Sequence, residues 1–406
     1  MLRCTIGVLA YNEEHNIIPA LHALLDQHLH TCEIAEIIVI ASGCTDRTVE
    51  RAQAMARAHP LITVDVQGER AGKAAAINRL IQLARCDVIV LAGADTLPDP
   101  TALELLVQPF ADPSVGMTGA RVVPLNGLRT FLGLTTQIMW RVHHRMALRW
   151  PKLGELVAFR KVVSALPVNT AADEVALEAL ISAQGYRLVY VPDAVVYNRG
   201  PQTLSDFLWQ RRRIFAGHLH IATTYGYMAA SLPPSHLIVL AAEAFKRYSF
   251  LLPLVAGAAF LESWARLLGA LDFLLGQRHH IWRPAPSTKQ LSPRSRPFMI
   301  VVLQCRAGSV RPARLIRALR DVPASQGELC WWSRRLSQVL FLVSADAAPL
   351  TPLEEQVKTL AAGLSFHGAS DSAAVLSYRV AHFMPSPLPS DAEGQPERAL
   401  GLAPAA

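Results

Sequence analysis

The segment Thr5-Ile-Gly-Val-Leu-Ala-Tyr-Asn-Glu-Glu14 decides the fold, because a run of aliphatic residues ends abruptly in polar ones. Residues 5–10 have the composition of a buried strand. The further runs predicted as strands are 34–40, 61–66 and 87–92. The segments between them that have helical apolar spacing are 16–29, 48–58 and 73–84. Buried strands alternating with helices predict a doubly wound α/β domain, a parallel sheet covered on both faces.

Polar residues follow each predicted strand, at the edge where such a sheet binds its ligand. The four loops are Tyr11–Glu14, Ser42–Thr48, Glu69–Asn78 and Gly93–Pro98. Taken singly, Asn12, Asp46 and Thr48 fit turns and helix caps equally well. Lys73 begins a predicted helix, a position that suits a phosphate. Taken together, the four loops predict a nucleotide-binding cleft.

Composition narrows the class of protein. The 406 residues are 51% hydrophobic and only 17% charged, with a mean hydropathy of +0.25 and a net charge of +7. These values exclude a disordered or fibrous chain, and we expect no nucleic-acid partner because the basic balance reflects few acids as much as many bases. Glu13 and Glu14 interrupt the first apolar run too early for a signal peptide, so we expect the N-terminal domain to fold in the cytoplasm.

The hydrophobic excess is concentrated at 232–275. We expect one membrane helix near 248–275, preceded by an interfacial helix at 236–245, with Lys246 and Arg247 as a basic flank. A buried or interfacial pair of hydrophobic helices is the alternative. A single span would place the C-terminal module across the membrane, and a re-entrant or interfacial hairpin would avoid this.

Four regions are expected along the chain. They are a nucleotide-binding domain at 1–231, hydrophobic membrane-associated helices at 232–290, a small α+β module at 296–385 and a disordered tail at 386–406. The strands predicted in the module are 298–304, 339–343 and 374–378, and its predicted helices are 311–320 and 353–364. For this module we expect a regulatory or assembly role without catalysis.

As a set, the motifs resemble those of the family 2 glycosyltransferases, which have the Rossmann-like GT-A fold. The resemblance extends over about residues 4–290 and includes the Gln-x-x-Arg motif of membrane-bound members. The matching motifs are Ala10-Tyr11-Asn12-Glu13-Glu14, Gly43-Cys44-Thr45-Asp46-Arg47-Thr48, Gly72-Lys73 with Asn78, Ala94-Asp95-Thr96, Phe159-Arg160, Asp173-Glu174, Gly185-Tyr186-Arg187, Pro192-Asp193-Ala194 and Gln210-Arg211-Arg212-Arg213.

The resemblance implies transfer of a sugar, with inversion, from a nucleotide-diphospho sugar to a lipid or saccharide acceptor at a membrane. It implies Mg²⁺ or Mn²⁺ held by Asp95, although Gly93 stands where the family's Asp-x-Asp motif has its first acid. It places the catalytic base at Asp173-Glu174, with Glu174 at the base position and Asp173 as the alternative. The residues implied to bind substrate are Tyr11, Asn12, Glu14, Asp46, Lys73, Asn78, Gln210 and Arg213.

Several of these motifs also fit purely structural roles, and two rival functions stay open. Asp95 fits a turn at a strand end, Asp173 and Glu174 fit a helix N-terminus, and Arg211 with Arg212 fits a helix on anionic lipid. A sugar-nucleotide nucleotidyltransferase shares the α/β core but needs a basic glycine-rich loop after the first strand. A degenerate transferase retained as a membrane assembly protein is the second rival, because Gly93 and Ile214 replace an acid and a tryptophan of the family pattern.

Overall fold

The computed structural model describes residues 1–127, 130–247, 252–277, 279, 281, 288, 298–305, 328–333, 338–344 and 375–383. The chain divides into two compact units, Met1–Ser292 and Pro293–Ala406.

In the first 98 residues of the first unit, strands and helices alternate. The strands are β1 (Leu2–Ala10), β2 (Cys32–Ser42), β3 (Ile62–Gln67), β4 (Val88–Gly93) and β5 (Thr96–Pro98). The helices are α1 (Ile17–Leu25), α2 (Thr48–Ala58) and α3 (Lys73–Leu83). The first four strands are parallel, in the order β3-β2-β1-β4. The predicted four strands and three helices are confirmed, although α1 stops at Leu25, where the backbone of Asp26 leaves the helical conformation (φ −86°, ψ 21°). Gln27 Nε2 donates to the Ala23 carbonyl in the last turn, 2.8 Å away.

The second part of the sheet is mixed rather than parallel. Its elements are α4 (Ala102–Val107), the 3₁₀ helix η1 (Gln108–Ala111), β6 (Val115–Pro124), α5 (Phe131–Ala147), β7 (Val157–Arg160), α6 (Asp173–Ser182) and β8 (Arg187–Asn198). The full order is β3-β2-β1-β4-β7-β6-β8-β5. β7 runs antiparallel to β4 and β6, whereas β6 and β8 are parallel. The fold is therefore a Rossmann-like α/β fold with a mixed sheet.

Helices cover both faces of this sheet, as predicted. On β2, Ile37 and Val39 face the core under α1 and α2, while Ile38 and Ile40 face the core under α3 and α6. Gly7 of β1 lets α3 approach closely, since a Cβ there would overlap Leu80. Because alternate residues of a strand point to opposite faces, continuous aliphatic runs are needed to fill both cores.

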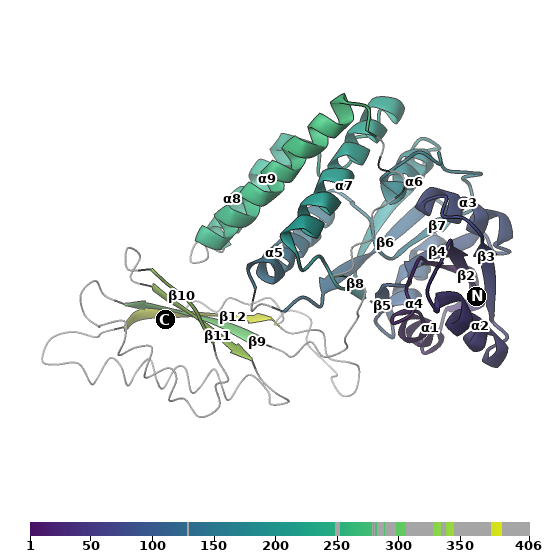
Figure 1. The fold of residues 1–406 in the computed structure, drawn as a ribbon, viewed down its shortest axis with the longest axis horizontal. Helices are drawn as coiled ribbons and strands as arrows, with labels where there is room; N and C mark the ends of the chain where they lie inside the picture. Colours follow the sequence, from purple (N-terminus) through teal and green to yellow (C-terminus); the bar gives the residue numbers. More distant parts are fainter. Residues whose placement is uncertain are drawn as a thin grey trace, which may run out of the picture. The chain divides into compact units, whose positions relative to one another are not determined.

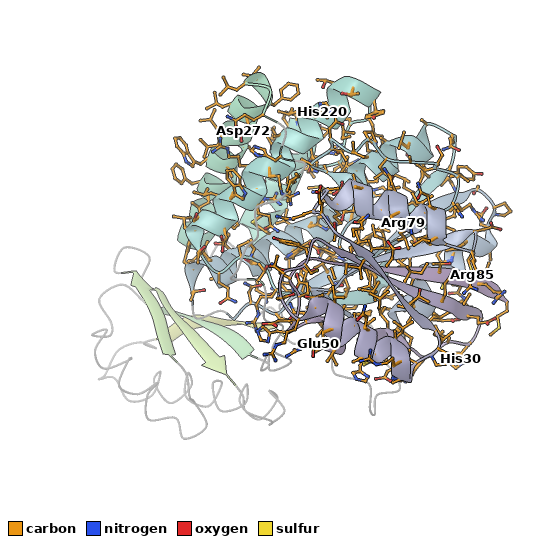
Figure 2. All side chains as sticks on the ribbon, turned by 45° about the vertical axis from the view of Figure 1, so that its right-hand side comes forward. His30, Glu50, Arg79, Arg85, His220 and Asp272 are labelled. Atoms are coloured by element: carbon orange, nitrogen blue, oxygen red, sulfur yellow. The ribbon has the colours of Figure 1, made fainter. Side chains whose placement is uncertain are left out.

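A layer of helices lies beside the sheet (Figure 1). It comprises α5, α7 (Leu204–Tyr225), α8 (Pro234–Arg247) and α9 (Leu252–Leu274). The Thr203 hydroxyl caps α7 by accepting from the Asp206 N–H, and Gly226 ends this helix at φ +65°. α9 packs along α7, and Gly269 allows this contact because a Cβ there would overlap the Arg212 carbonyl. In Figure 2, Asp272 and His220 mark this helical layer, whereas Arg79 and Arg85 lie on the sheet side.

The hydrophobic segment is helical where helices were expected. Within the described residues, one helix, Leu254–Leu274, is long and apolar enough to cross a membrane, judged by length and composition alone. The helix expected at 236–245 lies inside α8, and the one expected near 248–275 corresponds to α9.

The second unit contains an antiparallel sheet with the order β10-β11-β9-β12 (Figure 1). Its strands are β9 (Phe298–Cys305), β10 (Glu328–Ser333), β11 (Gln338–Ser344) and β12 (Val375–Phe383). Three of them match predicted strands, and β10 was not predicted. The helices expected at 311–320 and 353–364, and the tail at 386–406, lie outside the described residues.

Candidate active site

A cavity of about 680 Å³ opens at the carboxyl ends of β1 and β4 and extends to the helical layer. Its walls come from the loops after these strands, from the N-termini of α3 and α6, and from α5, α7, α8 and α9. The predicted site residues that line it are Tyr11, Lys73, Asp95, Glu174, Gln210 and Arg213. Segments that lie far apart in the sequence, from Leu9 to Arg266, therefore share one chamber.

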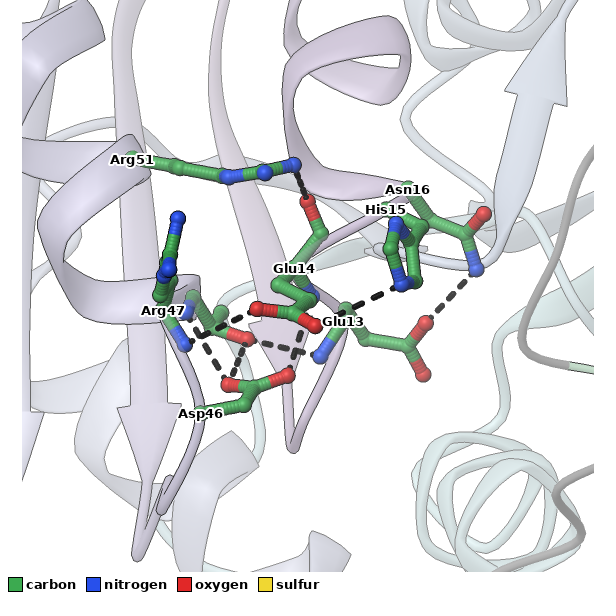
Figure 3. A network of polar contacts seen from close by, with 8 residues as sticks. Glu13, Glu14, His15, Asn16, Asp46, Arg47 and Arg51 are labelled. Atoms are coloured by element: carbon green, nitrogen blue, oxygen red, sulfur yellow. Dashed lines mark hydrogen bonds and ion pairs between the residues drawn. The ribbon is translucent and has the colours of Figure 1, made fainter.

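Three other predicted residues, Asn12, Glu14 and Asp46, lie in the loops after β1 and β2, beside the cavity. Their side chains form hydrogen bonds that join the two loops. The Asp46 carboxylate accepts from the backbone N–H groups of Glu14 (3.1 Å) and Thr48 (2.9 Å). Glu14 Oε2 accepts from the Arg47 N–H at 3.3 Å (Figure 3). Burial alone would raise the pKa of Asp46, but the hydrogen bonds from Thr48 and Glu14 outweigh it and hold this pKa below its usual value. The network fixes the loops after β1 and β2.

Asn12 belongs to the same pair of loops. It adopts φ +52°, and its side chain bridges to Thr45, donating to Oγ1 at 3.1 Å and accepting from the N–H at 2.8 Å. Asparagine tolerates this left-handed conformation better than most residues. Next to it, Arg70 lies over the Tyr11 ring, 3.8 Å from the centroid, and both side chains line the cavity.

The structure does not bring Asn78 to the cavity. Its side chain clamps the backbone of Leu166, donating to the carbonyl at 2.8 Å and accepting from the N–H at 2.6 Å. Both ends of the amide are used, so Asn78 fixes the loop before α6 against α3.

Lys73 and Glu174 form an ion pair across the cavity wall. Lys73 begins α3 after Gly72, whose φ of +92° suits glycine, and Glu174 lies in the first turn of α6. Burial would lower the pKa of Lys73, but the charges of Glu174 and Asp173 outweigh it and raise this pKa. Burial would likewise raise the pKa of Glu174, and Lys73 reverses the effect and lowers it. Both groups are therefore held ionised.

Asp173 lies behind the cavity wall and is fully buried. Within the described part of the chain, neither carboxylate oxygen of Asp173 has a hydrogen-bond partner. Burial raises the pKa of Asp173 to about 7, with Lys73 opposing the rise and Glu174 adding to it. Of the acidic pair, the structure thus turns Glu174 toward the cavity and Asp173 away from it.

Arg213 of α7 completes the cationic side of the chamber. It is 6% exposed, and its Nη1 donates to the Ala171 carbonyl at 2.9 Å. Burial lowers the pKa of Arg213 to about 10, while Asp173, Glu174 and Glu155 oppose this change. Gln210, one helical turn earlier, lines the same cavity.

Asp95 lies directly after β4, and its carboxylate occupies the space beside Gly93. A Cβ on Gly93 would collide with Asp95 Oδ1. In an Asp-x-Asp motif, position 93 would carry the first acid. Here Gly93 has no side chain, and the carboxylate of Asp95, the second acid, takes the space beside it.

Glu155 is a cavity residue that the sequence motifs did not single out. It adopts φ +63°, a conformation that non-glycine residues rarely take outside functional sites or turns. Burial raises the pKa of Glu155 to about 7, and the charge of Asp95 adds to the rise. The sequence signal was Gly154-Glu155 just before Phe159-Arg160, an acid in a turn entering a buried strand. Lys152, three residues earlier, also lines the cavity and is not among the predicted site residues.

These residues fit a divalent cation that is shared with a diphosphate. No group of three or more His, Cys, Asp or Glu residues within the described ranges could hold a metal by itself. Mg²⁺ in nucleotide sites, however, is held by one or two carboxylates together with substrate phosphates. Asp95, with Glu155 close enough to feel its charge, supplies that number of carboxylates in one cavity.

Two family models match the chain. Glycosyl transferase family 2 matches residues 5–170, and Glycosyl transferase family group 2 matches residues 88–274. Together they cover the sheet, the cavity and most of the helical layer. Both models describe glycosyltransferase family 2, so the predicted resemblance to that family and to its GT-A fold is confirmed.

Among curated proteins, the chain is 28% identical over 222 residues to the poly-beta-1,6-N-acetyl-D-glucosamine synthase of Staphylococcus aureus. The match covers 51% of this chain, and the chain spans about half the length of that relative (52%). A mannosyltransferase from Pyrobaculum calidifontis, solved with GDP-Man and Mn²⁺, has a TM-score of 0.48 at 23% identity and covers 68% of this chain and 88% of its own. Glucosyl-3-phosphoglycerate synthase from Mycobacterium tuberculosis has a TM-score of 0.39 at 19% identity, covering 54% and 78%.

Proposed function

We propose that the protein transfers a sugar, with inversion, from a nucleotide-diphospho sugar to an acceptor hydroxyl, and that it requires Mg²⁺ or Mn²⁺. The observation that carries this proposal is the convergence of Lys73, Asp95, Glu174 and Arg213 on one cavity. They come from α3, the loop after β4, α6 and α7, and together they provide cations for a diphosphate and a carboxylate for a proton.

The donor's diphosphate is assigned to the cationic wall. Lys73 at the N-terminus of α3 and Arg213 on α7 are placed to neutralise it. Asp95, assisted by Glu155, would hold the metal, which neutralises the charge that develops on the leaving diphosphate. Arg70 stacked on Tyr11 forms a flat surface that suits a nucleobase, next to the loops fixed by Asn12, Glu14 and Asp46.

Glu174 is assigned as the base. In the transfer, the acceptor oxygen forms a bond to the anomeric carbon, and the bond from that carbon to the diphosphate oxygen breaks. The electron pair leaves with the diphosphate, and the acceptor proton passes to the Glu174 carboxylate. Because Lys73 is the partner of Glu174 here, arrival of the diphosphate would draw Lys73 away and make Glu174 a stronger base.

The helical layer supports a place at a membrane surface. The side of α9 that packs on α7 carries ion pairs, Arg211 with Glu262 and Arg212 with Asp272. Its opposite side is an exposed apolar stripe at helical spacing, namely Phe260, Trp264, Leu267, Leu271 and Leu274. We propose that this stripe enters the lipid interface, with α8 and α9 lying along the membrane and the catalytic domain on the cytoplasmic side.

The proposed organisation follows from these assignments. Residues 1–231 form the catalytic domain and 232–290 the membrane-associated helices that close the cavity. The module at 296–385 is proposed to act in regulation or assembly. The products would be polysaccharide or glycolipid, and a lipid or saccharide acceptor would enter from the helical side.

A binding and turnover experiment tests the proposal. Purified protein is titrated calorimetrically with UDP and GDP, with and without Mn²⁺, and then assayed for release of nucleoside diphosphate from nucleotide-sugars. We expect metal-dependent binding of one nucleotide, and loss of release in Glu174→Gln with binding retained. Binding of neither nucleotide would instead favour a degenerate assembly protein.

A further inference from the structure

The cavity wall formed by α7, α9 and the loop after α5 carries basic side chains to which no role is assigned above. Lys152, Arg211 and Arg266 line it. Two histidines, His143 of α5 and His218 of α7, also line the cavity. Burial and the charges of Lys152 and Arg211 lower the pKa of both well below its usual value, so they serve there as neutral hydrogen-bonding groups. These five residues are called the basic cluster below. They come from four different parts of the fold, so tertiary structure creates the cluster.

The acids nearby do not balance this charge. Among the described residues that line the cavity, Glu262 is the acid that pairs with the cluster, and two arginines, Arg211 and Arg266, share it. It accepts two hydrogen bonds from Arg211, each 2.7 Å long, and one from Arg266 Nε at 2.8 Å. Glu178 lies behind the wall, where it accepts from the Leu153 N–H (2.7 Å) and the Tyr227 hydroxyl (3.1 Å). Burial raises the pKa of Glu178 to about 7, which leaves it only partly charged.

Lys152 is the cation with the weakest compensation. Within the described ranges, no hydrogen bond or ion pair engages its ammonium group. Burial, together with the charges of Arg211 and Arg266, lowers the pKa of Lys152 to about 7, against the opposing effect of Glu178 and Glu262. The ammonium is therefore only partly charged near neutral pH, because holding its charge away from water without a partner is costly. An anion bound in the cavity would remove that cost.

This site is separate from the one assigned to the donor. On α7, Arg213 faces Asp173, Glu174 and Glu155, whereas Arg211 is bound to Glu262 of α9. The two arginines thus serve two sides of one chamber, the first at the strand ends and the second toward the membrane-associated helices. An anion at the basic cluster would lie on the acceptor side.

The cavity beyond the cluster is apolar. α8 contributes Leu237 and Ala241, and α9 contributes Val255, Ala258 and Ala259. Small and branched side chains of this kind suit a hydrocarbon chain and offer nothing to a hydroxyl-rich glycan. α9 also carries the exposed apolar stripe, so the apolar wall and the proposed lipid-facing surface belong to one helix.

We propose that the basic cluster binds a phosphate group that the acceptor carries apart from the hydroxyl to be glycosylated, and that the apolar walls of α8 and α9 hold a lipid chain attached to this phosphate. The proposal rests on the proposed function, because it names the acceptor class of that cavity. Arginine forks and a lysine ammonium are the side chains that bind phosphate most strongly in proteins. A neutral saccharide acceptor would leave the cluster's charge uncompensated.

The test is a binding comparison on the full chain in detergent micelles, with farnesyl phosphate, farnesol and glycerol 3-phosphate as probes. Tryptophan fluorescence reports binding. We expect farnesyl phosphate to bind at least tenfold more tightly than farnesol. Lys152→Met should remove most of that difference without changing farnesol affinity, and His143→Gln should reduce it. The matched control is Lys161→Met, which alters a lysine outside the cavity whose ammonium donates to the Ala84 carbonyl at 2.7 Å.

Each outcome decides a separate point. Equal affinities for farnesyl phosphate and farnesol, or unchanged phosphate preference in both variants, would overturn the phosphate site. Equal affinities for glycerol 3-phosphate and farnesyl phosphate would support the phosphate site but overturn its lipid carrier. Nucleotide binding with Mn²⁺ is measured on the same samples. If it fails while the phosphate preference persists, the proposed function falls, and a lipid-phosphate site without an acceptor role remains.

Discussion

Lys73 and Glu174, which lie 101 residues apart in the sequence, form an ion pair in the wall of the cavity. Both side chains are about one-fifth exposed. The pair therefore links the group assigned to the diphosphate with the group assigned as base. Changes at either residue should affect both stability and catalysis.

Removing Lys73 should destabilise the fold. Lys73→Met leaves Glu174 buried without its cation, and loss of one partner of a buried pair costs about 3 kcal/mol. Lys73→Met combined with Glu174→Gln should cost less than the sum of the single changes, with a coupling of about 1–3 kcal/mol. Thermal unfolding of the four proteins measures this. The exposed pair Arg187–Asp112 is the control, where solvent screening should leave a much smaller coupling.

Asp173 and Glu174, the two acids in the first turn of α6, should differ in their effect on the rate of sugar transfer. Glu174→Gln is expected to reduce the rate of sugar transfer by about 10²–10⁴-fold, the usual contribution of a general base. Asp173→Asn changes a group behind the wall and should reduce it far less. Single-turnover rates at saturating donor provide the comparison. A larger loss in Asp173→Asn than in Glu174→Gln would reassign the base to Asp173.

Gly93→Ala should weaken metal binding even though it adds only a methyl group. The new Cβ would displace the Asp95 carboxylate from its position beside Gly93. We expect Mn²⁺ affinity, measured by electron paramagnetic resonance with nucleoside diphosphate present, to fall severalfold. Gly68→Ala is the matched control, because a Cβ at Gly68 meets no atom within 4 Å. Equal Mn²⁺ affinity in both variants would contradict the role given to Asp95.

Glu262 should be essential for docking α9 onto α7. Glu262→Gln leaves Arg211 and Arg266 without their shared carboxylate, and we expect destabilisation of about 3 kcal/mol. The control is Glu33→Gln, which breaks an exposed pair with Arg3 and should cost less than about 1 kcal/mol. Thermal midpoints in detergent measure the difference. Similar shifts in both variants would mean that the Glu262 pair does not anchor the helix.

Lys152 should make stability depend on pH. Its pKa is about 7 in the folded protein and 10.5 in the unfolded chain, so the unfolded chain binds more protons between these values and stability rises with pH there. Below pH 7 both states are protonated, and the full penalty of the buried charge remains. Lys152→Met should therefore be more stable than the parent at pH 6, by up to about 5 kcal/mol, and this difference should vanish near pH 10.5.

The difference in stability between the parent and Lys152→Met reports on Lys152 alone. Its charged and titratable neighbours are present in both proteins, so their titration largely cancels. These neighbours are Arg211 on α7, Arg266 and Glu262 on α9, Glu178 on α6 and the two cluster histidines. Denaturant unfolding from pH 6 to 10 provides the measurement. A constant difference across this range would show that burial does not shift the Lys152 pKa.

The first half of the fold, and several residues that line the cavity, could be predicted from the sequence alone. A strand with a nearly continuous aliphatic sequence, such as 34–40, has apolar side chains on both faces and is buried when helices cover both sides of its sheet. Such runs predicted parallel strands in the observed order of elements. Because parallel strands end at one edge, it also followed that Tyr11, Lys73 and Asp95 would share a cleft. These features depend on local periodicity, which a single chain displays.

Tertiary structure alone decided the rest. Periodicity says nothing about pairing between distant segments, so the antiparallel insertion of β7 and the contact between Lys73 and Glu174 could not be read from spacing. Asn78 has the sequence position of a substrate residue, but its amide is used by Leu166. The shifted pKa values of Glu155 and Lys152 depend on burial and on nearby charges. These are set by the groups that pack around a side chain in the fold and not by its neighbours in sequence.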